Sequence, residues 1–237
     1  MTTPSDIKKS KVLPFMLDAK GSAPEIEKSL YEGPAATIIV GPADKSTTYI
    51  VPLALICHRS RFFDRALNGY FKESILNRVE LPEDTVEEFE LLLEWIYCKK
   101  VPWTSYIQGI EKIINFYLVA DKFDVAGPFG KVDTNLRTIL VDHWYAICIE
   151  YGTLAYGFLE SVYQLPTGHE ARRLFAKACV RPYLVYETLM KDPPYDNSLP
   201  TIRSNTSWLN VKAAFDTIDG FAMEVVKSLG ETMVKGL

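Results

Sequence analysis

The residue pattern changes its period at Pro52, and this change constrains the fold more than any other feature of the sequence. Before it, two runs rich in β-branched residues, Ala36–Val40 and Thr47–Val51, are separated by a Gly-Pro pair and a polar loop, which predicts a β-hairpin. After it, apolar residues recur at helical spacing as far as Leu67, and a proline is tolerated at the first helical position. We therefore expect a hairpin that leads into two short helices, divided near His58–Ser60.

A short strand and a long amphipathic helix follow. Asn77–Leu81 alternates outward charged residues with inward apolar ones, which predicts a half-buried strand that ends at Pro82. Asp84 and Glu87 have the spacing of a capping box, so we expect a helix to begin there. The apolar stripe of this helix consists of Val86, Phe89, Leu92, Leu93, Ile96 and Tyr97.

The other face of this helix, together with the residues just before it, is acidic. Carboxylates in the first turn are stabilised by the positive end of the helix macrodipole, which explains several of them without a partner. An acidic docking stripe is the alternative interpretation. The acidic residues are Glu80, Glu83, Asp84, Glu87, Glu88, Glu90 and Glu94.

The remainder of the chain is predicted to be mostly helical. At the N-terminus, residues 1–21 predict a flexible leader, and Ser22 with Glu25 predicts a short capped helix that runs to Tyr31. A proline-rich stretch, 192–207, predicts an exposed loop. Further helices are expected at 107–121, 132–141, 153–163, 169–177 and 209–229.

Composition excludes several classes of protein. The 237 residues are 48% hydrophobic and carry a net charge of −4, spread evenly, which favours a globular chain and argues against nucleic acid as the main partner. The N-terminus lacks the apolar region of a signal peptide, and no apolar run approaches the length of a membrane span. The four cysteines are too widely spaced for a short-loop disulfide framework or a zinc site. We expect an intracellular protein, cytoplasmic or nuclear, that is not secreted and does not bind a membrane.

Few residues are available for catalytic chemistry. The three histidines, His58, His143 and His169, stand in no recognisable catalytic setting, and the neighbours Cys57 and His58 would point about 100° apart on a helix. No phosphate-binding loop, dinucleotide-binding motif, nucleophile elbow or metalloprotease motif occurs. We therefore expect no enzyme activity, catalytic residue, metal, cofactor or small-molecule substrate. The alternative is an enzyme with an unfamiliar site in the C-terminal half, formed by a cluster of aromatic residues. Their near-helical spacing is more typical of a hydrophobic core. These residues are Trp144, Tyr145, Tyr151, Tyr156 and Tyr163.

Five blocks of the sequence, in this order, resemble the successive signatures of a BTB/POZ domain. The resemblance covers roughly Gly33 to Phe129 and implies an α+β fold, a small β-sheet flanked by α-helices. A later stretch, Val162–Pro166 with Glu170–Phe175, resembles the helical C-terminal region of many BTB proteins of filamentous fungi. We thus expect a BTB/POZ domain at 22–130 and an all-helical region at 131–237. The five blocks are Tyr49–Phe63, Phe71–Ser74, Val79–Asp84, Phe89–Tyr97 and Tyr117–Phe123.

The resemblance implies a non-enzymatic protein–protein interaction module. Members of the family often form homodimers and often recruit cullin-RING ubiquitin ligases or co-repressors. This sequence departs from the family's charged pocket at Ala36, Pro52 and Leu53, and no zinc-finger, kelch or MATH segment follows, so co-repressor binding is not implied. The main expectation is a substrate adaptor for a cullin-RING ligase. The alternative is a self-associating structural or regulatory BTB protein that recruits no ligase.

One tripeptide is a candidate for partner binding. Cullin-binding members of the family tend to carry a hydrophobic residue, any residue and then Glu after the second helix pair, and Phe71-Lys72-Glu73 fits that pattern. An exposed aromatic residue would anchor in a pocket of the partner, and the carboxylate would fix its orientation. The alternative is that Phe71 folds back onto the core and Glu73 is solvated. Dimers of the family use an N-terminal helix, of which Ser22–Tyr31 would be a short version, but the family's longer leucine-rich arm is not present, so the resemblance is compatible with both a monomer and a homodimer.

Overall fold

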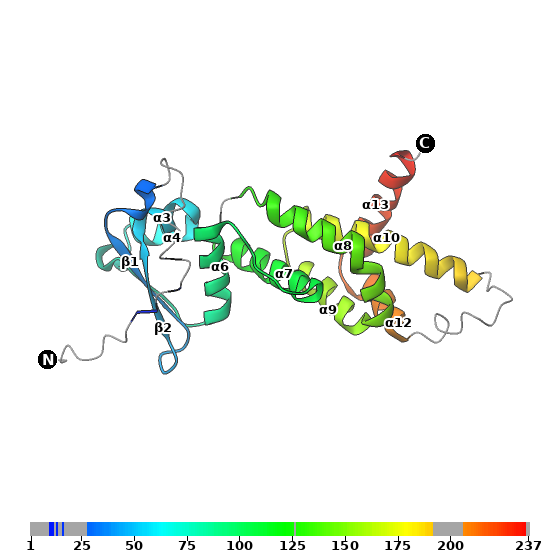
Figure 1. Ribbon diagram of the computed structural model, residues 1–237, viewed down its shortest axis with the longest axis horizontal. Coiled ribbons are helices and arrows are strands. Elements are labelled where there is room, and N and C mark those ends of the chain that lie inside the picture. Colours follow the sequence, from blue (N-terminus) through cyan, green and yellow to red (C-terminus); the bar gives the residue numbers. More distant parts are fainter. Residues whose placement is uncertain are drawn as a thin grey trace. The chain divides into compact units, whose positions relative to one another are not determined.

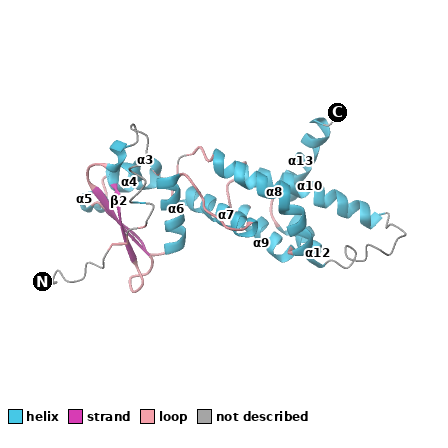
Figure 2. Cartoon of the chain, in the orientation of Figure 1, coloured by secondary structure: helices cyan, strands magenta, loops and turns pink. Residues whose placement is uncertain are grey.

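The computed structural model describes residues 10, 11, 13, 16, 28–125, 127–191 and 206–235. The chain divides into two compact units, which are treated separately here. The first unit comprises 1–101 and 115–128, and the second comprises 102–114 and 129–237. All three strands belong to the first unit, whereas the described part of the second unit is built from helices (Figure 2).

A three-stranded sheet of order β2-β1-β3 organises the first unit. β1 (Ala35–Val40) and β2 (Thr47–Pro52) form the predicted antiparallel hairpin. β3 (Arg78–Leu81) returns after three helices and pairs with β1 in parallel, with Ile38 opposite Val79. Alternate residues of each strand point into the core, so Val79 and Leu81 are buried while Arg78 and Glu80 are exposed, as predicted.

Helices cover the sheet, and Figure 1 shows three of them, α3, α4 and α6, beside β1 and β2. A single extended residue, Ser60, separates α3 from α4: its hydroxyl oxygen caps α4 by accepting the amide of Phe63 at 3.3 Å. The predicted division of the two short helices is therefore confirmed. The helical elements are η1 (Ser29–Tyr31), α3 (Leu53–Arg59), α4 (Arg61–Asn68), α5 (Lys72–Leu76), α6 (Val86–Cys98) and α7 (Tyr106–Lys122), of which residues 106–114 belong to the second unit.

Aromatic rings form the centre of this core. Phe63 stacks on Phe123 with ring centroids 5.4 Å apart, and Phe89 lies 5.2 Å from Tyr49 and 6.4 Å from Phe123. All four side chains are fully or almost fully buried. The rings come from β2, α4, α6 and the residue after α7, so this cluster joins the sheet to three helices.

The prediction that Asp84 and Glu87 form the capping box of α6 is wrong by one residue. The N-cap is Thr85, whose hydroxyl oxygen accepts the amide of Glu88 at 3.2 Å while the Glu88 carboxylate accepts the amide of Thr85 at 3.4 Å. Asp84 is buried and forms an ion pair with Lys122 at 2.7 Å instead. A carboxylate that is buried against a lysine is not available to cap a helix.

The second unit contains five further helices in its described part. The predicted helices at 132–141 and 169–177 are both longer than expected, and the second of them contains Pro182. The prediction of a single helix at 209–229 is wrong. This segment forms parts of two helices, which are separated at Gly220, a residue whose φ of +76° favours glycine. The five helices are α8 (Gly130–Glu150), α9 (Gly152–Val162), α10 (Glu170–Lys191), α12 (Thr206–Thr217) and α13 (Phe221–Lys235).

Three predictions fall largely on residues that the structure does not describe: the leader at 1–21, the capped helix that starts at Ser22, and the loop at 192–207. Four residues of the leader are described. Among them, the Lys11 amide donates to the carbonyl oxygen of Thr48 at 2.8 Å, and Leu13 is buried. Part of the leader therefore packs on β2.

Candidate protein-docking site

The candidate tripeptide lies at the start of α5. Phe71 has extended backbone and precedes the helix, and its carbonyl oxygen accepts the hydroxyl of Ser74 at 2.7 Å. The Phe71 side chain is 63% exposed, Lys72 is exposed and Glu73 is half-buried. Phe71 therefore does not fold back onto the core, and the alternative interpretation of this residue is wrong.

Phe71 belongs to a larger apolar surface, which we call the 70–76 patch. A five-residue helix cannot bury a full apolar face, and the left-handed Asn77, with a φ of 46°, ends it and leads directly into β3. Sequence periodicity missed α5 because five residues complete little more than one helical turn. The patch consists of Tyr70, Phe71, Ile75 and Leu76, all exposed.

A groove of about 790 Å³ runs beside this patch. Lys122, which lines the groove, pairs with Asp84 at 2.7 Å, and Arg65, also in the lining, pairs with Asp124 at 3.7 Å. The lining of the groove thus combines apolar side chains with charged ones, which is the composition of a protein-docking surface. Its lining includes Phe62, Ala66, Phe71, Leu76, Val79 and Pro82.

The acidic face of α6 has largely internal roles. The Glu90 carboxylate accepts the hydroxyl of Tyr49 at 2.6 Å and pairs with Lys11 at 2.5 Å. Burial and the neighbouring Glu90 carboxylate raise the pKa of Tyr49, which keeps the phenol protonated as a donor. With Asp84 paired to Lys122 and Glu88 in the capping box, these contacts favour helix electrostatics over an acidic docking stripe.

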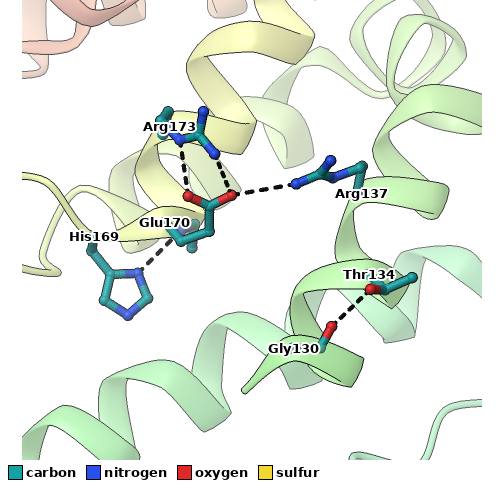
Figure 3. A network of polar contacts seen from close by, with 7 residues as sticks. Gly130, Thr134, Arg137, His169, Glu170 and Arg173 are labelled. Carbon is teal, nitrogen blue, oxygen red and sulfur yellow. Dashed lines mark hydrogen bonds and ion pairs between the residues drawn. The ribbon is translucent and has the colours of Figure 1, made fainter. Parts of the chain in front are cut away.

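The histidines lie in separate settings. His58 is exposed on α3, and the His143 ring stacks on Tyr106 at 4.3 Å. The His169 ring accepts the amide of Ala171 and so caps α10, next to a network in which Glu170 pairs with Arg137 of α8 and Arg173 (Figure 3). Within the described ranges, no three His, Cys, Asp or Glu side chains gather to hold a metal ion.

The aromatic residues of the second unit have separate contacts too. The Trp144 indole donates to the sulfur of Cys179 at 3.3 Å inside the core. The Tyr163 hydroxyl donates to Glu224 at 2.8 Å, and the Tyr156 hydroxyl lies 3.1 Å from that of Thr217. These contacts connect helical segments of the second unit, so Trp144, Tyr156 and Tyr163 serve packing.

Cys57 is expected to be an unreactive thiol. Burial, reinforced by the charge of Asp64, raises its pKa to about 11, so its thiolate fraction at pH 8 is on the order of a thousandth. We expect the rate of its alkylation by iodoacetamide to rise about tenfold per pH unit between pH 7 and 10. Mass spectrometry of the Cys57 peptide measures this rate. A plateau below pH 9 would contradict the expectation, and unfolded protein provides the control.

The comparisons with known proteins agree with this architecture. A family model of the BTB/POZ domain matches residues 39–140, which include the hairpin's β2, helices α3 to α7 and strand β3. The chain contains a BTB/POZ domain. A search of curated proteins found no match. No helix in the described part of the chain combines the length and apolar character that spanning a bilayer requires.

The BTB/POZ match confirms the predicted fold class, α+β with a small sheet flanked by helices and a helical C-terminal region. BTB/POZ domains are protein–protein interaction modules and are generally non-enzymatic. The signature block Phe71–Ser74 is the start of α5, and the block Tyr117–Phe123 is the end of α7 with the residue after it. The exposed 70–76 patch is therefore part of the BTB/POZ domain.

Proposed function

We propose that this BTB/POZ protein is a non-enzymatic substrate adaptor that binds a cullin scaffold of a RING ubiquitin ligase through Phe71, Lys72 and Glu73. The observation that carries the proposal is the exposure of Phe71 at the start of α5, inside the family's domain. Aromatic residues that become fully buried on binding supply most of the energy of many interfaces. The BTB/POZ domain, at 22–130, would hold the scaffold, and the helical region at 131–237 would complete the fold or bind a client.

The chemistry of α5 supports this assignment. Ile75 and Leu76 extend the apolar surface beyond Phe71, and the half-buried Glu73 lies between Phe71 and Ile75 in sequence. A partner helix with an apolar face and one cationic or hydroxyl side chain would match this combination. Lys72 is exposed beside them and would contact the polar rim of such an interface.

The test is retention of the full chain by an immobilised cullin N-terminal region. We expect Phe71→Ala and Glu73→Lys each to weaken binding by about 10- to 30-fold, because loss of a buried anchor costs about 2 kcal/mol. Met223→Ala is the matched control, since Met223 is 60% exposed, close to the 63% of Phe71, but lies on α13 of the second unit.

Two outcomes contradict the proposal. Retention that neither substitution changes would place the interface elsewhere on the chain. No retention of the unsubstituted protein, combined with a mass that exceeds one chain, would favour the alternative function, a self-associating BTB protein that recruits no ligase.

A further inference from the structure

Strand β3 is an edge of the sheet in the part of the chain that the structure describes, since the order is β2-β1-β3. The Thr37 amide donates to the carbonyl oxygen of Asn77 at 2.8 Å, and the Gly41 amide donates to that of Leu81 at 2.9 Å. Backbone groups of successive strand residues point to opposite sides of the strand, so Asn77, Val79 and Leu81 face β1. The amides and carbonyls of Arg78 and Glu80 therefore point outward, away from β1.

Space lies on both faces of this edge. The groove of about 790 Å³ beside the 70–76 patch and a second hollow of about 760 Å³ over the outer face of the sheet share Arg78, Glu80 and Pro82 in their linings. The Arg78 and Glu80 side chains are 48% and 62% exposed and pair with each other at 2.6 Å. An added strand would thus have room for side chains that point to either face.

The charges on β3 are arranged symmetrically. Arg78 and Glu80 are opposite charges on either side of Val79, and both point to the outer face of the sheet. If a second β3 lies antiparallel across a two-fold axis at Val79, Arg78 of each copy stands opposite Glu80 of the other. A parallel neighbour in register would place like charges opposite each other instead. The charge pattern is therefore self-complementary in one orientation.

We propose that β3 is a self-association edge, at which two copies of this chain join their sheets by antiparallel β3–β3 pairing. In this register Arg78 and Glu80 of opposite copies form hydrogen-bonded pairs, each of which exchanges both backbone hydrogen bonds, and Val79 occupies the non-hydrogen-bonded position on the axis. These are the residues whose backbone groups point outward. Pro82 follows the strand and limits the pairing to a short ladder.

This interface does not depend on cullin binding, and its test uses different residues and a different readout. The full chain and its variants are measured by light scattering after size exclusion, over a range of protein concentrations. We expect a mass that rises toward twice the 26.8 kDa of one chain for the unsubstituted protein. Arg78→Glu alone and Glu80→Arg alone place like charges opposite each other, so each variant should remain at the mass of one chain.

Two further samples make the test specific to this register. The double variant Arg78→Glu, Glu80→Arg restores opposite charges across the axis and should recover the dimer. An equimolar mixture of the two single variants should also form dimers, because one chain then carries two acidic side chains on β3 and the other carries two arginines opposite them. Far-ultraviolet circular dichroism checks that each variant is folded.

The proposal has three contradicting results. A single-chain mass for the unsubstituted protein would overturn it and leave the edge uncovered or open to another protein. A dimer that all variants retain would overturn it in favour of another interface. Loss of the dimer that neither the double variant nor the mixture reverses would overturn the assigned register. Each result is independent of whether the cullin region is retained.

Discussion

Phe89→Ala is expected to lower the free energy of unfolding of the first unit by about 3 to 5 kcal/mol, as large-to-small substitutions of buried aromatic residues do. Phe89 is fully buried on α6 and contacts the rings of Tyr49, Phe63 and Phe123. Removal of the ring leaves a cavity between the sheet and three helices, and edge-to-face contacts are lost as well. A loss of this size is between about a fifth and the whole of the stability of a typical domain, which is about 5 to 15 kcal/mol.

Urea unfolding followed by circular dichroism measures the loss, and hydrogen exchange with mass spectrometry locates it. Amides of β1, β2 and α6 should lose protection, whereas those of α8 to α10 should change less. The matched control is Phe71→Ala, which removes the same ring from an exposed position and should change stability by less than about 0.5 kcal/mol. Equal effects of the two substitutions would contradict the assignment of Phe89 to the core.

Arg172→Met is expected to lower the free energy of unfolding of the second unit by about 3 to 5 kcal/mol, because it leaves a largely buried carboxylate without its partner. Arg172 of α10 is buried, pairs with Glu224 of α13 at 2.8 Å and donates to the carbonyl oxygen of Leu165 at 3.2 Å. Its guanidinium also lies over the ring of Tyr163, 4.3 Å from the centroid. One side chain thus joins α10 and α13 to the segment that follows α9.

A double substitution separates the ion pair from simple packing. Arg172→Met with Glu224→Gln removes both charges. The amide oxygen at position 224 can still accept a hydrogen bond from the Tyr163 hydroxyl, so the double variant should be less destabilising than Arg172→Met alone. The neighbouring Arg173→Met is the control: Arg173 is exposed and pairs with Glu170, so its loss should cost less than about 1 kcal/mol. If Arg173→Met cost as much as Arg172→Met, burial would not be the cause.

The Tyr163 phenol belongs to the same cluster. Burial, and then the Glu224 carboxylate, raise its pKa above the ordinary value of a tyrosine, so the phenol stays protonated and donates a hydrogen bond to Glu224. Among the residues that the structure describes, Tyr163→Phe would leave this carboxylate with Arg172 as its partner.

Sequence reasoning predicted the elements whose signal is local and periodic. The hairpin, the division near Ser60, β3 and the apolar stripe of α6 each depend on alternation or helical spacing within a few residues, and the structure contains all of them. Phe71 could be chosen as a candidate from the family pattern alone. The exposure of Phe71 could not be predicted from the sequence, because it depends on how much of α5 the rest of the domain covers.

The errors have long-range causes. Asp84 and Thr85 are both good N-cap residues in sequence, and the choice between them depends on Lys122, which lies far away along the chain. Gly220 interrupts an apolar pattern that continues on both sides, so periodicity alone predicts one helix where there are two. The outward backbone groups of β3 follow from its parallel pairing with β1, which no local pattern encodes.

The first unit is not one continuous stretch of sequence, and this affects how the protein is made. Its core needs Phe123, which stacks on Phe63, although the sheet and α6 are complete at Cys98. At synthesis rates of about 5 to 20 residues per second, a nascent chain would display an unfilled aromatic core for on the order of a few seconds. Chaperones that recognise exposed rings could act during that interval. An expression fragment that stops at residue 101 lacks Phe123, so its aromatic core would stay unfilled permanently.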